Sequence, residues 1–197
     1  MSHGTRVVIA EDEAIIRLDL REMLEEEGYE VVGEAGSGEA AIKLVEELRP
    51  DLVILDIVMP GMDGLTAAAH IDEQQLAAVV ILTAFSQRDY VARATRAGAM
   101  AYLVKPFDKS DLIPAIKVAL ARWDEARALA NESRDLSERL ETRKVVERAK
   151  GMLMEEHGLS EQDAFRMIQR TAMERRVSMR DVADRVLTGD LKGRETS

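Results

Sequence analysis

The first hundred residues alternate between short apolar runs and longer stretches in which apolar residues recur with helical spacing. Leu52-Val53-Ile54-Leu55 and Val79-Val80-Ile81-Leu82 are apolar throughout, which is typical of strands buried on both faces of a parallel sheet. Strands alternating with helices of 10–15 residues predict a doubly wound α/β domain with five parallel strands. The predicted strands are residues 6–10, 30–34, 51–55, 79–83 and 101–104, and the predicted helices are 14–27, 38–48, 65–76 and 88–97.

From residue 111 onward the pattern is helical throughout. Up to about residue 156 the only interior helix breakers are Pro114 and Gly151. Apolar residues follow a heptad-like spacing, which favours a partner helix or an amphipathic packing face. They are Leu112, Ile116, Ala119, Trp123, Ala126 and Ala130, followed more weakly by Leu136 and Leu140.

Two serines and one glycine divide the end of this helical part. Gly158 is a left-handed helix end after His157, and Ser160 and Ser178 are N-caps of two further helices, the last running to about residue 188. The chain is therefore predicted to hold an α/β domain at 5–125, a helical linker at 126–134 and an all-α three-helix domain at 135–190.

Charge is distributed unevenly between these parts. Residues 1–134 hold 14 Lys and Arg against 24 Asp and Glu, whereas residues 135–197 hold 13 of each, so the first part carries the whole net charge of −10. This difference predicts different partners for the two parts, and the overall acidity argues against non-specific coating of DNA.

Other composition features exclude several classes of protein. There is no cysteine, and the three histidines lie far apart, which disfavours disulfides, zinc sites and histidine-based triads. No apolar run approaches the ~20 residues that span a bilayer, and the first residues lack a signal-peptide core. We expect a cytoplasmic protein without membrane contact.

Acidic residues stand where the predicted strands end. Glu11 and Asp12 follow the first strand and Asp56 follows the third, and the carboxyl ends of parallel strands share one edge of the sheet. Carboxylates this close repel one another unless a cation lies between them. An oxygen-rich site of this kind suits Mg²⁺, with the backbone carbonyl of Val58 as a further ligand.

The remaining polar residues at these strand ends fit phosphoryl transfer, in which positioning and charge stabilisation dominate. Asp56 is the predicted nucleophile and forms an acyl phosphate, while Asp12 binds Mg²⁺ directly and Glu11 assists. Thr83 ends the fourth strand and donates its hydroxyl to a phosphoryl oxygen. Lys105 follows the fifth strand and offers its charge to another, and we expect a cis bond between Lys105 and Pro106.

These residues lie in motifs that resemble the receiver domain of bacterial two-component response regulators, over residues 5–125. The resemblance implies a sensor histidine kinase as partner and no enzymatic activity. It also implies that Tyr102 swings inward when Thr83 engages the phosphoryl group, and that Glu11 replaces a commoner aspartate. The motifs are Val8-Ile9-Ala10-Glu11-Asp12-Glu13, Leu55-Asp56-Ile57-Val58-Met59-Pro60-Gly61-Met62-Asp63-Gly64, Thr83-Ala84 and Tyr102-Leu103-Val104-Lys105-Pro106-Phe107.

The C-terminal part resembles the ANTAR domain, a small helical RNA-binding module. Together the two parts are similar to the actinobacterial phosphorylation-dependent transcription antitermination regulators. That resemblance implies hairpins in nascent transcripts and RNA polymerase as partners, and a homodimer on activation. The residues that carry it are Ala149-Lys150-Gly151-Met152-Leu153-Met154, Ser160, Ala164-Phe165 and Ala172-Met173 before Arg175-Arg176.

Cations in this part flank an apolar arc formed by Val145, Val146, Ala149, Met152 and Leu153 on a helical wheel. RNA loops are bound by such cations together with contacts to splayed bases. Gly151 in mid-helix costs about 1 kcal/mol relative to alanine, so close approach of RNA or of another helix is its expected role. The predicted RNA-binding residues are Lys144, Arg148, Lys150, Gly151, Arg170 and Arg176.

Two other output functions are open at this point. In a DNA-binding response regulator the last helix would be the recognition helix, but its long cations, Arg180 and Arg185, stand beside Asp181 and Asp184, a poor set for a phosphate-lined groove. In a purely protein-binding output the heptad-like stretch would be the contact. For the RNA-binding output, we expect phosphorylation to pair two chains through residues 112–130, so that two output domains bind one RNA.

Overall fold

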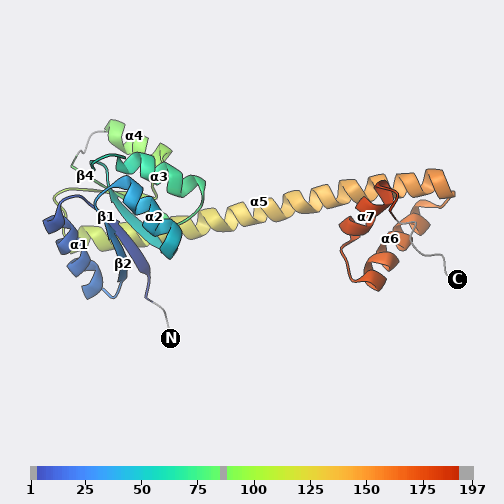
Figure 1. The fold of residues 1–197 in the computed structure, drawn as a ribbon, viewed down its shortest axis with the longest axis horizontal. Coiled ribbons are helices and arrows are strands. Elements are labelled where there is room, and N and C mark those ends of the chain that lie inside the picture. The colour runs from blue at the N-terminus through green and yellow to red at the C-terminus, as the bar shows by residue number, and fades with distance from the viewer. Residues whose placement is uncertain (1–3, 85–87, 191–197) are drawn as a thin grey trace. The chain divides into compact units, whose positions relative to one another are not determined.

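The computed structural model describes residues 4–84 and 88–190 of the chain (Figure 1). It divides into two compact units, Met1–Arg127 and Ala128–Ser197. In the described part, no helix combines the length and the apolar character needed to cross a membrane.

The first unit is built on one parallel sheet. Its strands are β1 (Arg6–Ala10), β2 (Glu30–Ala35), β3 (Leu52–Asp56), β4 (Ala78–Thr83) and β5 (Ala101–Val104). They pair in the order β2-β1-β3-β4-β5, and every pair is parallel. The doubly wound five-stranded sheet predicted from the sequence is confirmed.

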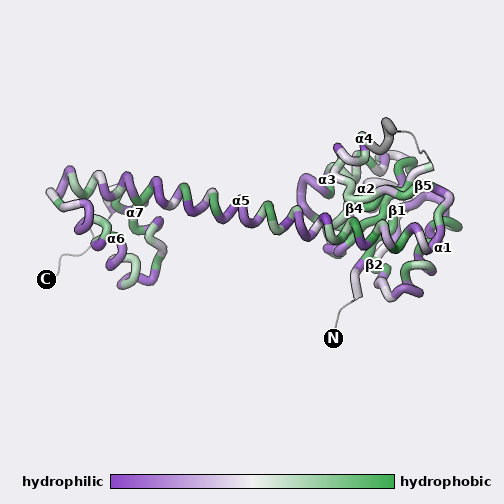
Figure 2. The backbone as a smooth tube through the Cα atoms, turned by 180° about the vertical axis from the view of Figure 1, so that it is seen from behind, coloured by the Kyte–Doolittle hydropathy of each residue, from purple (hydrophilic) through white to green (hydrophobic). Residues whose placement is uncertain are grey.

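Helices cover both faces of this sheet. They are α1 (Ala14–Glu26), α2 (Gly38–Leu48), α3 (Gly64–Glu73), α4 (Arg88–Arg96) and the start of α5 (Lys109–His157). One apolar cluster joins the sheet to α2, α3 and α4, and a second joins it to α1 and α5. Strand β3 serves both clusters, with Val53 and Leu55 in the first and Leu52 and Ile54 in the second. This explains its uninterrupted apolar sequence, and Figure 2 shows the hydrophobic colouring concentrated in the sheet around β1 and β4.

The heptad-like residues at the start of α5 pack on the sheet. Leu112, Ile116, Ala119 and Trp123 are all at most 5% exposed and belong to the second cluster. The expectation that chains pair through residues 112–130 is therefore wrong for these four positions, because the first unit already covers them. The spacing correctly indicated an amphipathic face, but the partner is a sheet.

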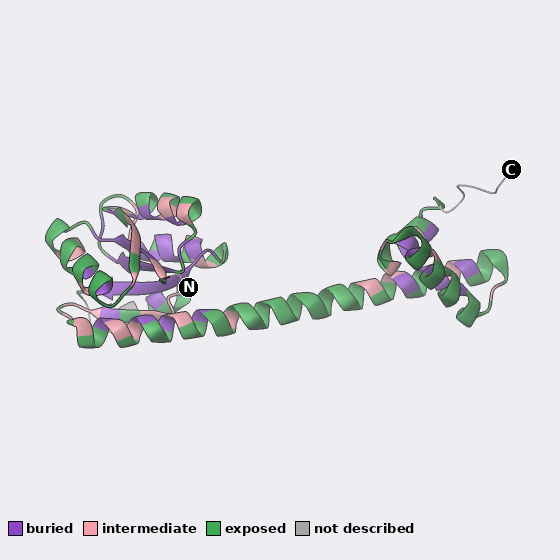
Figure 3. Cartoon of the chain, turned by 90° about the horizontal axis from the view of Figure 1, so that it is seen from below, coloured by how far each residue is buried: buried purple, intermediate pink, exposed green. Residues whose placement is uncertain are grey.

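Beyond the sheet, α5 runs on without a break through the predicted linker. Every residue from 127 to 141 is exposed (Figure 3). Leu129, Leu136 and Leu140 lie in this stretch and are 60%, 53% and 59% exposed. Leu136 and Leu140, the last members of the heptad-like pattern, are thus not covered by any described part of the chain, and Leu129 is exposed on the same stretch.

The second unit packs the last turns of α5 against α6 (Glu161–Arg175) and α7 (Met179–Leu187). Ser160 and Ser178 cap α6 and α7 by accepting hydrogen bonds from the backbone N–H of Asp163 and Asp181, and Gly158 has a φ of 65° at the end of α5. The predicted three-helix domain and its caps are confirmed. Its core consists of Val146, Ala149 and Leu153 from α5, Ala164, Ile168 and Ala172 from α6, and Val182, Ala183 and Val186 from α7.

Candidate functional site: an acidic cluster at the carboxyl ends of the strands

Three carboxylates meet at the carboxyl ends of β1 and β3. Glu11 and Asp12 directly follow β1, and Asp56 is the last residue of β3. Each offers an oxygen, and these oxygens lie within 4.8 Å of one another. Glu11 and Asp56 are buried, at 0% and 6% exposed, while Asp12 faces solvent. Strand pairing places them together because β1 and β3 are parallel neighbours.

Lys105 closes the cluster from the end of β5. Its Nζ donates hydrogen bonds to Glu11 Oε2 at 2.6 Å and to Asp56 Oδ2 at 3.0 Å. The peptide bond between Lys105 and Pro106 is cis, as the sequence predicted. Thr83, the last residue of β4, is 2% exposed and lies beside Val104 in the β4–β5 pairing.

Burial and the excess of carboxylates over lysine shift the pKa values of residues in the cluster. Burial, together with the nearby charge of Asp56, raises the pKa of Glu11 despite its hydrogen bond to Lys105. Burial would lower the pKa of Lys105, but its hydrogen bonds to Glu11 and Asp56 and their charges raise it overall. One lysine therefore faces three carboxylates and cannot neutralise them all.

The donors of this cluster fit a hard divalent cation. All three acidic side chains offer oxygen, and one of them, Asp12, is open to solvent, as suits Mg²⁺, which retains several waters. Val58 lies two residues beyond Asp56 in the same loop and its side chain is 60% exposed. No sulfur or imidazole ligand joins the acidic group among the described residues.

The loop after Asp56 is held by close backbone contacts that sequence reasoning assigned no role. A Cβ on Gly64 would lie 1.9 Å from the Asp56 carbonyl oxygen, so only glycine fits. The N–H of Gly64 donates to the carbonyl of Ile57 at 3.0 Å. Glu39 at the start of α2 accepts from the N–H of Met62 at 2.9 Å. These contacts fix the loop that carries Val58, and the glycine in the Asp63-Gly64 pair was the available signal.

Tyr102 stands apart from the acidic cluster. It lies on β5 opposite Ile81 of β4, and 45% of its surface is exposed. The strand that carries it ends two residues later, at Val104, next to Lys105. This places the predicted switch residue, partly exposed to solvent, on the strand that leads directly to the lysine.

Most of the predicted RNA-binding residues lie on the surface of the second unit. Lys144, Arg148, Arg170 and Arg176 are exposed. Lys144 pairs with Glu141 at 2.7 Å, and Arg176 caps α6 with a left-handed backbone of φ 54°. No described atom lies within 4 Å of a Cβ built on Gly151, so a neighbouring helix in this chain does not explain that glycine.

Lys150 differs from the other predicted RNA-binding residues. Its side chain is only 8% exposed, and its Nζ donates to Glu147 at 2.9 Å and to Glu161 of α6 at 2.8 Å. The structure therefore counts against Lys150 as an RNA contact, because its charge is already paired and its chain is covered. The helical wheel placed it at the edge of the apolar arc but gave no sign of Glu161.

Comparisons with known proteins agree with both units. A family model described as the response regulator receiver domain matches residues 7–117, and one described as the ANTAR domain matches residues 134–187. The transcriptional regulatory protein PdtaR of Mycobacterium tuberculosis is 62% identical over 182 residues, which is 92% of this chain and 89% of that protein.

Solved structures match the first unit. The signal receiver domain of the putative response regulator NarL from Mycobacterium tuberculosis has a TM-score of 0.58 at 30% identity, covering 60% of this chain and 98% of that one. A CheX–CheY complex with BeF₃ and Mg from Borrelia burgdorferi has a TM-score of 0.54 at 30% identity, covering 56% of this chain and 85% of that one. From the matched domains and the extent of identity, this chain belongs to the response regulators that join a receiver to a C-terminal ANTAR domain, a family of non-enzymatic transcriptional regulators.

Proposed function

We propose that this chain accepts a phosphoryl group on Asp56 from a sensor histidine kinase and then acts as an RNA-binding transcription antiterminator. The observation that carries the first half is the convergence of Glu11, Asp12 and Asp56 on Lys105. The second half is supported by the ANTAR match and by PdtaR, whose name describes a transcriptional regulator.

Asp56 is suited to be the phosphoacceptor because its two oxygens have different surroundings. Oδ2 accepts from Lys105, which leaves Oδ1 to attack phosphorus. The new O–P bond forms as the P–N bond to the kinase histidine breaks, and the imidazole leaves with the bonding pair. Lys105 then turns its ammonium to a phosphoryl oxygen, and the Thr83 hydroxyl donates to another.

Mg²⁺ would be held by Glu11, Asp12, Asp56 and the Val58 carbonyl, and when bound it neutralises charge on the phosphoryl oxygens. Movement of Thr83 toward the phosphoryl group would open space beneath β5, into which Tyr102 turns. The exposed ring of Tyr102 is the starting position that such a movement requires.

The proposed RNA contacts are the exposed cations of the second unit. Lys144 and Arg148 lie one turn apart on α5, where Gly151 leaves open space for a ribose or a phosphate. Arg170 and Arg176 belong to α6 and its C-cap, and the Arg170 side chain is 76% exposed. Exposed cationic side chains are suited to bind the phosphates of an RNA hairpin and so to orient it. Contacts to the bases of its loop would then supply sequence specificity.

We also propose that activation pairs two chains through the exposed leucines of α5. Leu129, Leu136 and Leu140 form an apolar stripe that is exposed to solvent. The same stripe on a second chain would cover it by helix–helix packing. Two output domains on one transcript would bind more tightly than one through effective concentration. Because antitermination acts on a transcribing RNA polymerase, the effect of pairing on read-through is to be measured in a transcription assay that contains the polymerase.

One experiment separates the proposed function from its alternatives. The full chain, with and without phosphorylation, is titrated with RNA hairpins and with duplex DNA at a fixed salt concentration. We expect hairpin binding that strengthens on phosphorylation, with weak duplex binding. Preferential duplex binding would favour a DNA-binding regulator, and binding to neither would favour a protein-binding output.

A further inference from the structure

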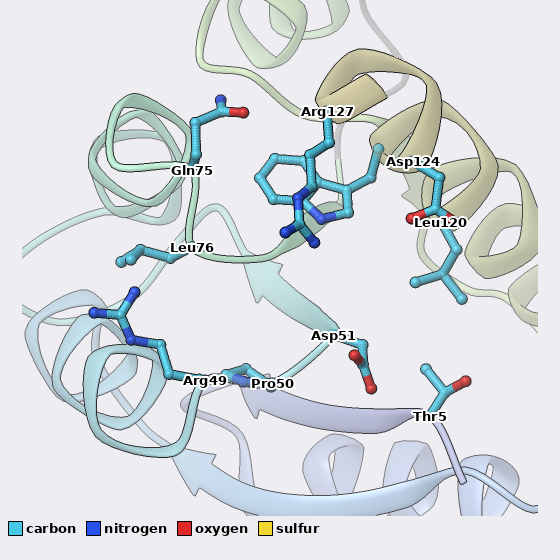
Figure 4. Close-up of a pocket in the computed structure, with 10 residues that line it drawn as sticks. Thr5, Arg49, Pro50, Asp51, Gln75, Leu76, Leu120, Asp124 and Arg127 are labelled. Atoms are coloured by element: carbon cyan, nitrogen blue, oxygen red, sulfur yellow. The ribbon is translucent and has the colours of Figure 1, made fainter. Parts of the chain in front are cut away.

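A second candidate site lies at the opposite end of the sheet from Asp56. A cavity of about 560 Å³ opens beside the segments that precede β1, β3 and β4, and its remaining wall is the part of α5 from Leu120 to Arg127 (Figure 4). This volume is in the usual range for a small-molecule site. The receiver function described above uses none of these residues.

The cavity is lined mainly by polar groups, with a few buried apolar residues among them. Pro50, Leu76 and Trp123 are buried, with Trp123 only 5% exposed. The rim consists of the exposed side chains of Arg49, Asp51, Gln75, Asp124 and Arg127. Small-molecule sites are more often lined by apolar side chains, so this mainly polar lining suits a polar, charged ligand.

Two rim residues have an unusual backbone. Arg49 has a φ of 47° and Gln75 a φ of 52°, and they are two of the three non-glycine residues with positive φ in the described ranges. Glycine adopts this conformation at less cost. Both residues lie in turns that end helices, where the N–H of Arg49 donates to the carbonyl of Val45 and the N–H of Gln75 donates to the carbonyl of Asp72. These turns place a long polar side chain at the rim from each of two loops.

The two arginines of the rim are available to an anion. Neither Arg49 nor Arg127 forms an ion pair with any residue for which the structure gives a placement. Arg127 lies over the ring of Trp123, with its Cζ 6.0 Å from the ring centroid, and Figure 4 shows its side chain reaching across the opening while Arg49 stands at the margin. A guanidinium backed by an aromatic ring can stack a planar group on its other face and bind phosphate at its edge.

The carboxylates restrict which anion fits. Asp51 already accepts a hydrogen bond from the N–H of Arg6 at 2.8 Å, whereas Asp124 is exposed on α5. With two arginines and two aspartates the rim carries no net charge, so a bare anion gains little. A carboxylate accepts two hydrogen bonds from a planar group with adjacent donors, as guanine offers with N1–H and its amino group.

We propose that this cavity binds a guanine mononucleotide, with the base stacked on Arg127 and paired to Asp124 and the phosphate held by Arg49. Such a ligand would join α5 to the loops before β3 and β4 just before α5 leaves the first unit. It would thereby give the receiver a second input, separate from Asp56.

The test uses the full chain, whose only tryptophan is Trp123. Emission from Trp123 is titrated with GMP, AMP, guanosine and inorganic phosphate, and equilibrium dialysis of labelled GMP gives an independent measure of binding. We expect GMP to bind at least about tenfold more tightly than the other three probes, since AMP lacks the pairing to Asp124, guanosine lacks the phosphate, and inorganic phosphate lacks both contacts of the base. Arg49→Ala should weaken GMP about tenfold or more, and Asp124→Asn should remove the preference for GMP over AMP.

Arg134→Ala is the matched control, because Arg134 is an exposed arginine of α5 outside the cavity. It should bind GMP as the unaltered chain does. The proposal is overturned if dialysis finds no GMP retained at millimolar concentration, or if Arg49→Ala binds GMP unchanged. Equal binding of phosphate and GMP would also overturn it, by showing an anion site that does not recognise a base.

Discussion

Among the described residues, two largely covered lysines each bridge two carboxylates, one lysine in each unit. Lys105 bridges Glu11 and Asp56, and Lys150 bridges Glu147 and Glu161, at distances between 2.6 and 3.0 Å in both cases. Both lysine side chains are largely covered, at 15% and 8% exposed. By distance alone the two arrangements look alike.

They differ in the surroundings of the acids. The side chains of Glu11 and Asp56 are 0% and 9% exposed, and Asp12 adds a third carboxylate. Glu147 and Glu161 are 55% and 71% exposed and remain in contact with water. The first lysine leaves a buried excess of negative charge, which calls for a further cation, whereas water screens the small excess around the second.

A lysine that bridges two carboxylates therefore indicates a reactive site only when the acids are buried and outnumber the lysine. Otherwise it is a structural contact, here one that ties α5 to α6. Four predictions test this distinction.

The largest effect is expected from Asp56→Asn, which removes the proposed nucleophile. Phosphoryl transfer from a histidine kinase or an acyl phosphate donor should fall by more than about a thousandfold. The fold should persist, since the amide keeps the shape of the side chain. Asp19→Asn, at an exposed position of α1, is the control and should accept phosphate normally; labelling of Asp56→Asn at the normal rate would contradict the assignment.

Lys105→Met should lower the free energy of unfolding by about 3 kcal/mol without divalent cations, because it leaves the buried Glu11 without its cationic partner and with only the N–H of Glu13 as a donor. Mg²⁺ should recover part of that loss by screening the carboxylates. Urea denaturation with and without Mg²⁺ measures both. The control is Lys109→Met, whose lysine pairs with exposed Glu26 and Glu27; equal stability of the two variants would refute the distinction drawn here.

The variants Arg148→Ala and Lys150→Met should differ in RNA affinity and in its dependence on salt. Arg148→Ala should weaken hairpin affinity about tenfold and reduce the slope of log affinity against log salt by about one, as expected for one lost phosphate contact. Lys150→Met should keep the slope, because Glu147 and Glu161 already compensate that charge. A reduced slope for Lys150→Met would return Lys150 to the RNA contacts.

The smallest effect is a dependence on pH. The hydrogen bond from Lys150 lowers the pKa of Glu161, so the stability from this contact is present above the carboxyl's unfolded pKa and is lost as pH falls through the folded pKa. The difference in unfolding midpoint between the unaltered chain and Lys150→Met should therefore shrink on acidification from neutral pH to about pH 3. A difference that stays constant across this range would mean that packing of the lysine stem, rather than its charge, stabilises the contact.

The sequence was sufficient for those features that follow from strand order. Continuous apolar runs identify buried strands, and parallel strands bring Glu11, Asp56 and Lys105 to one edge although 94 residues separate the outermost two. The caps at Ser160 and Ser178 are equally local and were read correctly.

Features that depend on a distant partner could not be read in this way. The periodicity of Leu112 to Trp123 fixes a face of α5 but not whether a sheet or a helix covers it. Lys150 lies at the edge of an apolar arc. Its hydrogen bond to Glu161 depends on how α6 packs against α5, which the sequence pattern does not reveal. The left-handed backbone of Arg49 and Gln75 could not be predicted from residue type, because neither arginine nor glutamine favours that conformation.

The exposed stretch of α5 from 127 to 141 has a consequence for hydrogen exchange. Packing holds both ends of the helix, but its middle depends on helix propensity and local pairs such as Asp135 with Arg139, which are weak. Amide protons there should exchange faster than those at either end, since the local helix–coil equilibrium opens without disturbing a core. A second chain that covers Leu129, Leu136 and Leu140 would slow that exchange. Exchange rates of individual amides in the middle of α5 would therefore detect pairing of two chains.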